Sequence, residues 1–232
     1  MADLARWFRG HWQLIALTVA VFLLWSTPIV LPLKLLVVLF HELSHGLVAI
    51  LTGGEILSLS VNIQQGGLAI TRGGSRFLIL TAGYLGSLGI GVALLLIALR
   101  TKADRMVLGG LGAIILVVLV LYVRDPVAMG ICLATAAAML AAARYLSQQA
   151  CDLMLRLIGL SSMIYVPYDI FDDTLRRASL NSDARMLAEE FGGTTMMWGG
   201  LWLILSLVAI QWCLRRGLGR DSNLTIGPIL RR

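Results

Sequence analysis

The hydrophobic residues of the chain gather in long runs that short polar breaks separate. A helix needs about 20 mostly apolar residues to cross the hydrocarbon core of a bilayer. Six runs fit this description, at residues 12–31, 33–52, 77–99, 106–123, 127–143 and 196–214. A seventh segment, residues 145–168, is ambiguous, because Asp152 and Arg156 stand near its start. The pattern predicts an all-α polytopic membrane protein with six to seven transmembrane helices.

Two stretches depart from this pattern of spanning helices. Residues 55–74 alternate between apolar and polar side chains, and Gln65-Gly66-Gly67 interrupts the alternation, which predicts a small β-hairpin at the membrane surface. A strand of this hairpin could pair with an extended substrate, or the hairpin could simply connect two spans. Residues 182–191 predict a short amphipathic surface helix that Ser182 caps.

The composition supports a membrane protein over a soluble one. The 232 residues are 58% hydrophobic and 14% charged, whereas a soluble domain usually carries about 25% charged residues. The three cysteines form no CxxC pair, which argues against a disulfide framework and a thiolate metal site. We therefore expect residues 1–232 to form a single integral membrane domain, in the cell membrane, with a retained first span at residues 1–32 and a core at residues 33–214.

The net charge of +6 includes a basic tail at residues 215–232. The tail is short and lacks aromatic residues, so it is more typical of a membrane-surface anchor than of a nucleic-acid arm. We expect the lipid bilayer as a partner and no nucleic acid. If all seven segments span the membrane, lysine and arginine divide almost evenly between its two sides, and the tail favours a cytoplasmic C-terminus.

The second apolar run contains the motif H-E-x-x-H, formed by His41, Glu42 and His45. A charge at the bilayer centre costs about 2.5–3.5 kcal/mol, so ionisable residues there need a functional reason. Residues i and i+4 share one face of a helix, so the two histidines can bind one metal ion. Glu42 is one position further on, where the general base of a metallohydrolase stands. The motif predicts a zinc site within the membrane.

A hydrolytic zinc ion commonly has three protein ligands and a water. His11 is a poor third ligand, because it lies at the outer edge of the first apolar run. The carboxylates that follow the ambiguous segment are better candidates, and we rank Asp169 first because it is nearest to the apolar residues, followed by Asp172 and Asp173. These three residues could instead form a solvated acidic turn.

The chain resembles the site-2 protease class of intramembrane zinc metalloproteases, and within it a compact branch without large inserted domains. The resemblance is carried by HELSHGLVAILTGGEI with TRGGSRFLILTAGYLGS, and by YDIFDD with NSDARMLAEEFGGTTMMWGGLW. It implies that His41, His45 and an aspartate bind zinc and that Glu42 activates water. The better-studied members place the third ligand in an N-x-x-P…L-D-G context, whereas this chain has Tyr165-Val-Pro-Tyr-Asp169.

From the motif and the resemblance we expect an intramembrane zinc metalloendopeptidase. Zn²⁺ would be held by His41, His45 and Asp169, Glu42 would be the catalytic base, and the substrate would be a membrane-embedded protein or peptide. The alternative is a catalytically inactive membrane protein of the same fold that binds transmembrane clients. Stoichiometric zinc in the purified protein would favour the enzyme.

Overall fold

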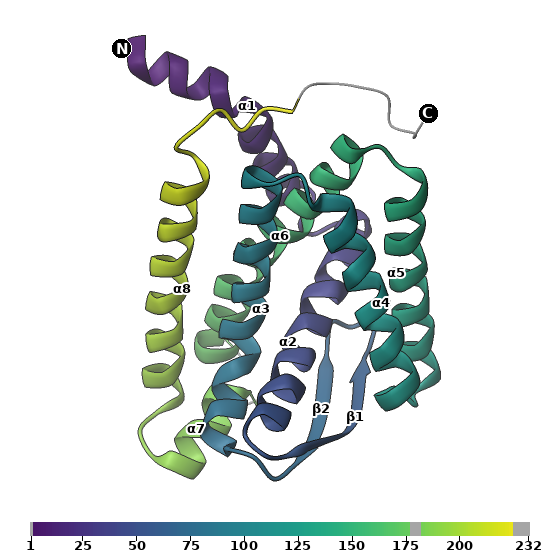
Figure 1. Ribbon diagram of the computed structural model, residues 1–232. Helices are drawn as coiled ribbons and strands as arrows, with labels where there is room; N and C mark the ends of the chain where they lie inside the picture. Colours follow the sequence, from purple (N-terminus) through teal and green to yellow (C-terminus); the bar gives the residue numbers. More distant parts are fainter. Residues whose placement is uncertain (1, 177–181, 225–232) are drawn as a thin grey trace.

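The computed structural model describes residues 2–176 and 182–224, as a bundle of helices with one small sheet (Figure 1). In chain order its elements are α1 (Ala2–Leu23), η1 (Pro28–Val30), α2 (Leu31–Leu51), β1 (Glu55–Val61), β2 (Gly67–Arg72), α3 (Arg76–Arg100), α4 (Asp104–Tyr122), α5 (Pro126–Tyr145), α6 (Gln148–Phe171), η2 (Asp172–Arg176), α7 (Asp183–Phe191) and α8 (Thr195–Gly217). The predicted fold class, helical with a small hairpin, is confirmed. Residues 225–232 of the basic tail lie outside the described residues.

Six segments of the described chain are long and apolar enough to cross a membrane: Pro28–Leu51, α3, α4, α5, Gln148–Thr174 and α8. The protein is therefore an integral, multi-pass membrane protein. The number of spans agrees with the sequence prediction, but their identity differs in two places. The ambiguous segment is a full span, and α1, which covers much of the first predicted span, is not among the six. Charged and polar residues in the first half of α1, such as Arg6, Arg9 and His11, lower its hydropathy.

The ambiguous segment becomes a span because its two charges neutralise each other. Asp152 and Arg156 are buried on one face of α6, and the Arg156 guanidinium forms a salt bridge with the Asp152 carboxylate through two nitrogens. A buried charge is tolerated when its partner and its hydrogen bonds are in place. A hydropathy profile therefore underestimates this segment as a membrane span, because it counts the two charges separately.

The segment after α8 forms hydrogen bonds with α1 and α6. Ser222 donates its backbone N–H to the Gly10 carbonyl at 2.9 Å, and its hydroxyl lies 2.8 Å from His11 Nδ1. The Ser222 carbonyl also accepts a hydrogen bond from the buried Arg156. One residue thus joins α1 to α6 and places the segment after α8 beside the first half of α1 (Figure 1).

Close packing of α3 against α2 and α6 forms the centre of the bundle. A Cβ on Gly91 would lie 2.3 Å from Ser162 Cβ, and one on Gly159 would lie 2.8 Å from the Gly91 carbonyl oxygen. Small residues let helices approach closely, and hydrophobic association between helices is weak in lipid, so such packing is a main source of stability. Gly83 serves the same purpose opposite α2, since its Cβ would lie 2.4 Å from His41 Nε2.

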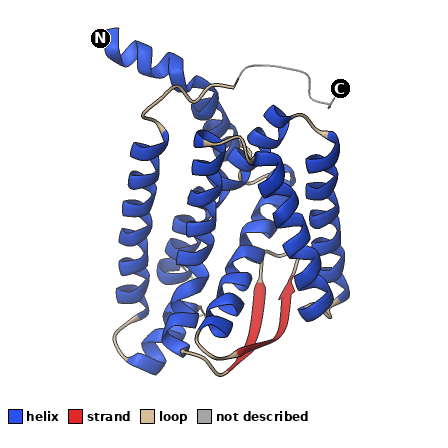
Figure 2. Cartoon of the chain, viewed as in Figure 1, coloured by secondary structure: helices blue, strands red, loops and turns tan. Residues whose placement is uncertain are grey.

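The predicted hairpin is present and lies along α2, in red in Figure 2. Strands β1 and β2 pair antiparallel, with Leu59 opposite Ala69 and Val61 opposite Gly67. Leu59 and Val61 are buried, which fixes the face that β1 turns to the bundle. Strand β2 contacts α2, the helix that carries the motif.

The predicted short helix is also present, as α7. Ser182 caps it by accepting a hydrogen bond from the Arg185 N–H at 3.3 Å, as the sequence suggested. The helix is not wholly superficial, because Asp183, Ala184 and Leu187 are buried. Helix α7 lies at the same end of the bundle as the hairpin (Figure 1), and its first residue, Asp183, is buried.

Candidate metal centre

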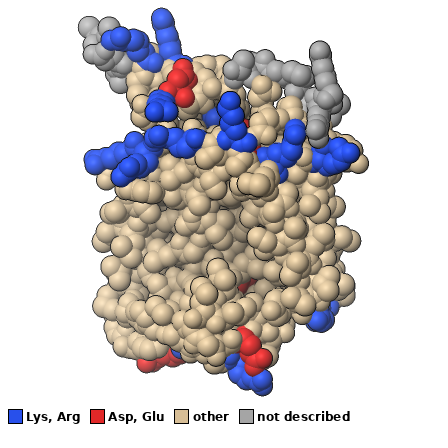
Figure 3. All heavy atoms as spheres, viewed as in Figure 1, with Lys and Arg blue, Asp and Glu red and all other residues tan. Residues whose placement is uncertain are grey.

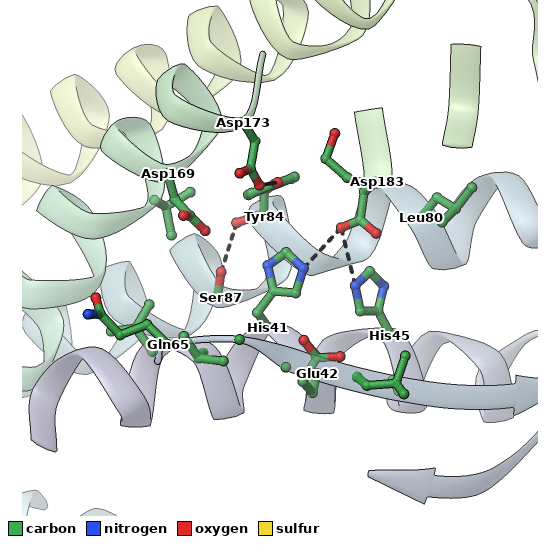
Figure 4. Close-up of a pocket in the computed structure, with 18 of the residues that line it drawn as sticks. His41, Glu42, His45, Gln65, Leu80, Tyr84, Ser87, Asp169, Asp173 and Asp183 are labelled. Carbon is green, nitrogen blue, oxygen red and sulfur yellow. Dashed lines mark hydrogen bonds and ion pairs between the residues drawn. The ribbon is translucent and has the colours of Figure 1, made fainter. Parts of the chain in front are cut away.

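The motif histidines and one carboxylate form a compact cluster (Figure 4). His41 Nε2 lies 2.9 Å from Asp183 Oδ2, and His45 Nε2 lies 3.2 Å from the same oxygen. One donor atom from each residue lies within 4.8 Å of the other two, and among the described residues this is the group that could hold a metal ion. Two imidazole nitrogens and a carboxylate oxygen form a ligand set used by catalytic zinc.

The orientation of His45 is fixed by its second nitrogen. His45 Nδ1 lies 2.7 Å from the Ile79 carbonyl oxygen on α3, so Nδ1 carries the proton and donates it. Nε2 is then the nitrogen that faces Asp183. Metal-binding histidines commonly donate their other N–H to a carbonyl or a carboxylate in this way, which fixes both tautomer and ring orientation.

The absence of a side chain at Gly83 makes room for both imidazoles. A Cβ at this position would lie 2.4 Å from His41 Nε2 and 2.6 Å from His45 Cε1, closer than any ordinary contact. The edge of the Tyr84 ring packs against the His41 ring, with 4.7 Å between ring centroids. Helix α3 thus forms one wall of the cluster and limits how the two histidines can move.

Asp183 is buried, with 7% of its surface exposed. Burial by itself would raise its pKa, but the attraction of His45, helped by contacts from both imidazoles, outweighs burial and holds the pKa of this carboxyl well below its ordinary value. The carboxylate form is therefore the resident one. Its Oδ2 accepts no hydrogen bond of regular geometry. A buried, anionic oxygen between two imidazole nitrogens fits a bound cation.

Glu42 lies beside this cluster, between α2 and the hairpin. It is 6% exposed, and its carboxylate accepts a hydrogen bond from the Ala69 backbone N–H on β2. A Cβ on Gly67 would lie 2.1 Å from Glu42 Oε1, so only glycine leaves room for the carboxylate here. Strand β2 therefore holds the carboxylate in place through its backbone alone.

The three aspartates ranked from the sequence lie near the cluster without joining it. Asp169 and Asp173 line the same cavity as the histidines, and Asp172 lines an adjoining one. The Asp173 carboxylate accepts a hydrogen bond of 2.5 Å from the Tyr84 hydroxyl, and Asp172 pairs with Arg176 at 3.8 Å. The structure brings Asp183, and not Asp169, to the two imidazole nitrogens. His11 lies away from the site, against Ser222.

Sequence reasoning overlooked Asp183, although one signal was available. Asp183 directly follows the capping Ser182 and stands beside Ala184 on the apolar face of a predicted amphipathic helix. An acid on that face needs a partner. The sequence predicts a surface helix for this segment, because nothing local in it shows where that face points.

The cluster opens into a cavity of about 440 Å³. Its walls come from α2, β2, α3, α6, η2 and α7, so elements from distant parts of the sequence meet around the histidines (Figure 4). Glu42, Tyr84 and Asp169 all face this space. The cavity is large enough to take a short stretch of polypeptide beside this cluster of side chains.

The model of one protein family, described as Peptidase M50B-like, matches residues 14–213. The chain belongs to the Peptidase M50B-like family. This places it in the site-2 protease class, as the resemblance suggested, and the match extends from α1 into α8. Peptidases of this class are in general zinc metalloproteases. No curated protein and no solved structure matches the chain in the other two comparisons.

Proposed function

We propose that this M50B-like protein is an intramembrane zinc endopeptidase that hydrolyses peptide bonds of membrane-embedded substrates. The observation that carries the proposal is the cluster of His41, His45 and Asp183, with Glu42 beside it and a cavity in front of it. The cluster lies among the spanning helices, because both histidines belong to the candidate span Pro28–Leu51. A substrate reaching them is most simply a segment that itself lies in the membrane.

We propose that His41, His45 and Asp183 hold the zinc ion. Their donor atoms are of the kinds zinc prefers, and Asp183 Oδ2 is already within 3.2 Å of both imidazole nitrogens. When bound, zinc supplies a Lewis acid that polarises the scissile carbonyl and brings the pKa of its water towards about 7. The sequence ranks Asp169 first as the third ligand. The zinc content of variants at Asp169 and at Asp183 distinguishes the two candidates.

In the proposed mechanism Glu42 is the general base. Its carboxylate takes a proton from the water as that water attacks the carbonyl carbon, and later gives the proton to the amine nitrogen as the C–N bond breaks. The Ala69 N–H and the absence of a side chain at Gly67 position this carboxylate. General acid–base catalysis of this kind contributes typically about 10²–10⁴-fold in rate.

Strand β2 offers the substrate a backbone partner. The Ala69 N–H points towards Glu42 and so away from β1, which means that the free edge of β2 borders the cavity. An extended segment can pair with such an edge through main-chain hydrogen bonds. Pairing would also hold the substrate unwound, and a peptide bond in a closed helix is not accessible to water.

The test compares the wild-type protein with Glu42→Gln on membrane proteins or peptides. We expect Glu42→Gln to keep stoichiometric zinc and to lose cleavage. A matched control is Glu189→Gln, because Glu189 is an exposed residue at the far end of α7. Full cleavage by Glu42→Gln would remove Glu42 from the mechanism. Absence of both zinc and cleavage in the wild-type protein would favour a protein that only binds transmembrane clients.

A further inference from the structure

Gln65, in the turn between β1 and β2, has an unusual backbone conformation. Its φ of 67° lies in the left-handed region, which glycine adopts freely and other residues rarely do. In the part of the chain that the structure describes, every other residue with a positive φ is a glycine. Two glycines follow directly in the sequence, yet the left-handed position carries a glutamine. Strained residues of this kind cluster at functional sites, where the surrounding structure holds them.

Asn62 holds the turn in this shape. Its side-chain oxygen accepts hydrogen bonds from the N–H groups of Gln64 and Gly66, both at 3.0 Å. Its backbone N–H donates to the Gly66 carbonyl at 2.9 Å, and its carbonyl accepts from the Gln65 N–H at 3.1 Å. These bonds use backbone groups and the Asn62 side chain, so the turn does not need the side chain of Gln65.

The Gln65 side chain lies at the junction of two cavities. It lines the cavity in front of the histidines, of about 440 Å³, and an adjoining one of about 280 Å³ that we call the side cavity. Tyr165 and Asp169 of α6 also line both spaces. In Figure 4, Gln65 lies on the same side of the histidines as Asp169. Its amide forms no hydrogen bond with another residue that the structure describes.

The walls of the side cavity are largely polar, and their charges are engaged. Its lining includes Trp25, Lys34, Tyr168 and Asp172. The Lys34 ammonium lies 4.7 Å from the centroid of the Trp25 ring, and Asp172 pairs with Arg176 at 3.8 Å. A space whose ions already have partners suits an uncharged polar group better than another ion.

A polar side chain within a membrane span finds few partners outside such a cavity. Figure 3 shows a broad band of the surface with few charged side chains between two charged ends. Both cavities are lined by residues of the candidate span Pro28–Leu51, so they lie among the spanning helices. A polar residue of a substrate span is costly in lipid, and it gains hydrogen bonds by entering a polar cavity.

We propose that the side cavity is a subsite for one uncharged polar side chain of the substrate, and that the Gln65 amide binds this side chain. An amide supplies both donors and an acceptor, so it is complementary to another amide or to a hydroxyl. The inference rests on the proposed function and narrows its substrates. They would be membrane-embedded segments that carry Asn, Gln, Ser or Thr close to the scissile bond.

Binding can be measured without cleavage, in the Glu42→Gln protein. The probes are synthetic spans of leucine and alanine in which one leucine is replaced by glutamine, at a position that moves by one residue from probe to probe. A net hydrogen bond between neutral groups changes affinity by about 2- to 10-fold. We expect one register of the glutamine span to bind more tightly than the all-apolar span by that factor.

Two substitutions of the protein test whether Gln65 makes this contact. Gln65→Leu should abolish the preference for the glutamine span, because it removes the amide and keeps a side chain of similar size. Gln211→Leu, at an exposed position of α8, is the matched control and should keep the preference. Equal affinity for the apolar and glutamine spans in every register, or a preference that survives Gln65→Leu, would overturn the proposal.

Thermal stability separates a glutamine kept for binding from one kept for the fold. Glycine adopts a φ of 67° without strain, so Gln65→Gly should melt at the wild-type temperature or above it and still lose the preference. A lower melting temperature would assign the glutamine to the stability of the turn and refute the argument from strain.

Cleavage distinguishes the subsite from the proposed function. If the spans bind as expected and the protein with Glu42 intact cleaves none of them, the peptidase fails while the subsite stands. If that protein cleaves the glutamine and apolar spans with equal kcat/KM, the subsite fails and the peptidase stands.

Discussion

Replacing Gly67 by alanine should displace the Glu42 carboxylate, the proposed general base, without touching the proposed metal ligands. The new Cβ would lie 2.1 Å from Glu42 Oε1. Real contacts of this kind are rarely shorter than 3.0 Å, so the carboxylate or the strand must move by almost 1 Å. A misplacement of about 1 Å at a reacting group can cost about 10²-fold in rate. We expect kcat/KM to fall by about that factor.

The assay for Gly67→Ala measures three quantities on one preparation: zinc content, helical content by circular dichroism, and cleavage of a model substrate. Zinc and helicity should be unchanged, and the loss should fall on kcat. Gly89→Ala is the control, because a Cβ at Gly89 in α3 meets nothing within 4 Å. Cleavage at the wild-type rate by Gly67→Ala would refute the positioning role of β2.

A double substitution sharpens the same prediction. Glu42→Asp shortens the side chain by one methylene, which makes room for the methyl group of Gly67→Ala. If the two residues interact, the double variant should be little worse than Glu42→Asp alone, because contacting residues give non-additive effects. Two independent losses that simply add would show that Gly67→Ala acts elsewhere.

Four further substitutions test the proposed ligands and the bundle. Asp183→Asn should lose zinc, and Asp169→Asn should keep it, as metal analysis of the purified proteins would show; the opposite result would restore the third ligand ranked first from the sequence. Gly83→Ala should weaken zinc binding by about 10-fold or more, since its Cβ would lie within 2.6 Å of both imidazoles. Asp152→Ala should lower the free energy of unfolding by about 3–5 kcal/mol in thermal or denaturant melts, because it leaves Arg156 buried without its carboxylate. Equal stability of that variant would mean that water already reaches the arginine.

The parts of the site that could be predicted from sequence are those set by local geometry. His41 and His45 face one side because four residues separate them on a helix, and Ser182 starts α7 because its hydroxyl caps the first turn. The third proposed ligand, a carboxylate, is different. Asp183 comes 138 positions after His45 in the numbering, and its place depends on where α7 is turned after α6 ends. Ranking acids by their distance from an apolar run could not recover that turn.

The fold shows the same division between local and distant causes. The alternation of residues 55–74 gave the hairpin, but the contact of Ala69 with Glu42 depends on how the hairpin lies on α2. The span α6 was ambiguous because a hydropathy profile adds Asp152 and Arg156 as two costs, whereas in the bundle they form one neutral pair. For α1, apolar length alone suggested a span.

The contacts of Ser222 have a consequence for the order of assembly during synthesis. Its partner His11 is 211 positions earlier in the chain. At about 5–20 residues per second, a ribosome adds the intervening length in about 10–40 s. The hydrogen bonds between α1 and the segment after α8 therefore form only after all six spans have been synthesised. A protein arrested or truncated before this residue would keep the proposed metal ligands and the packing of α1 on α6, and yet lose the hydrogen bonds that join α1 to the segment after α8.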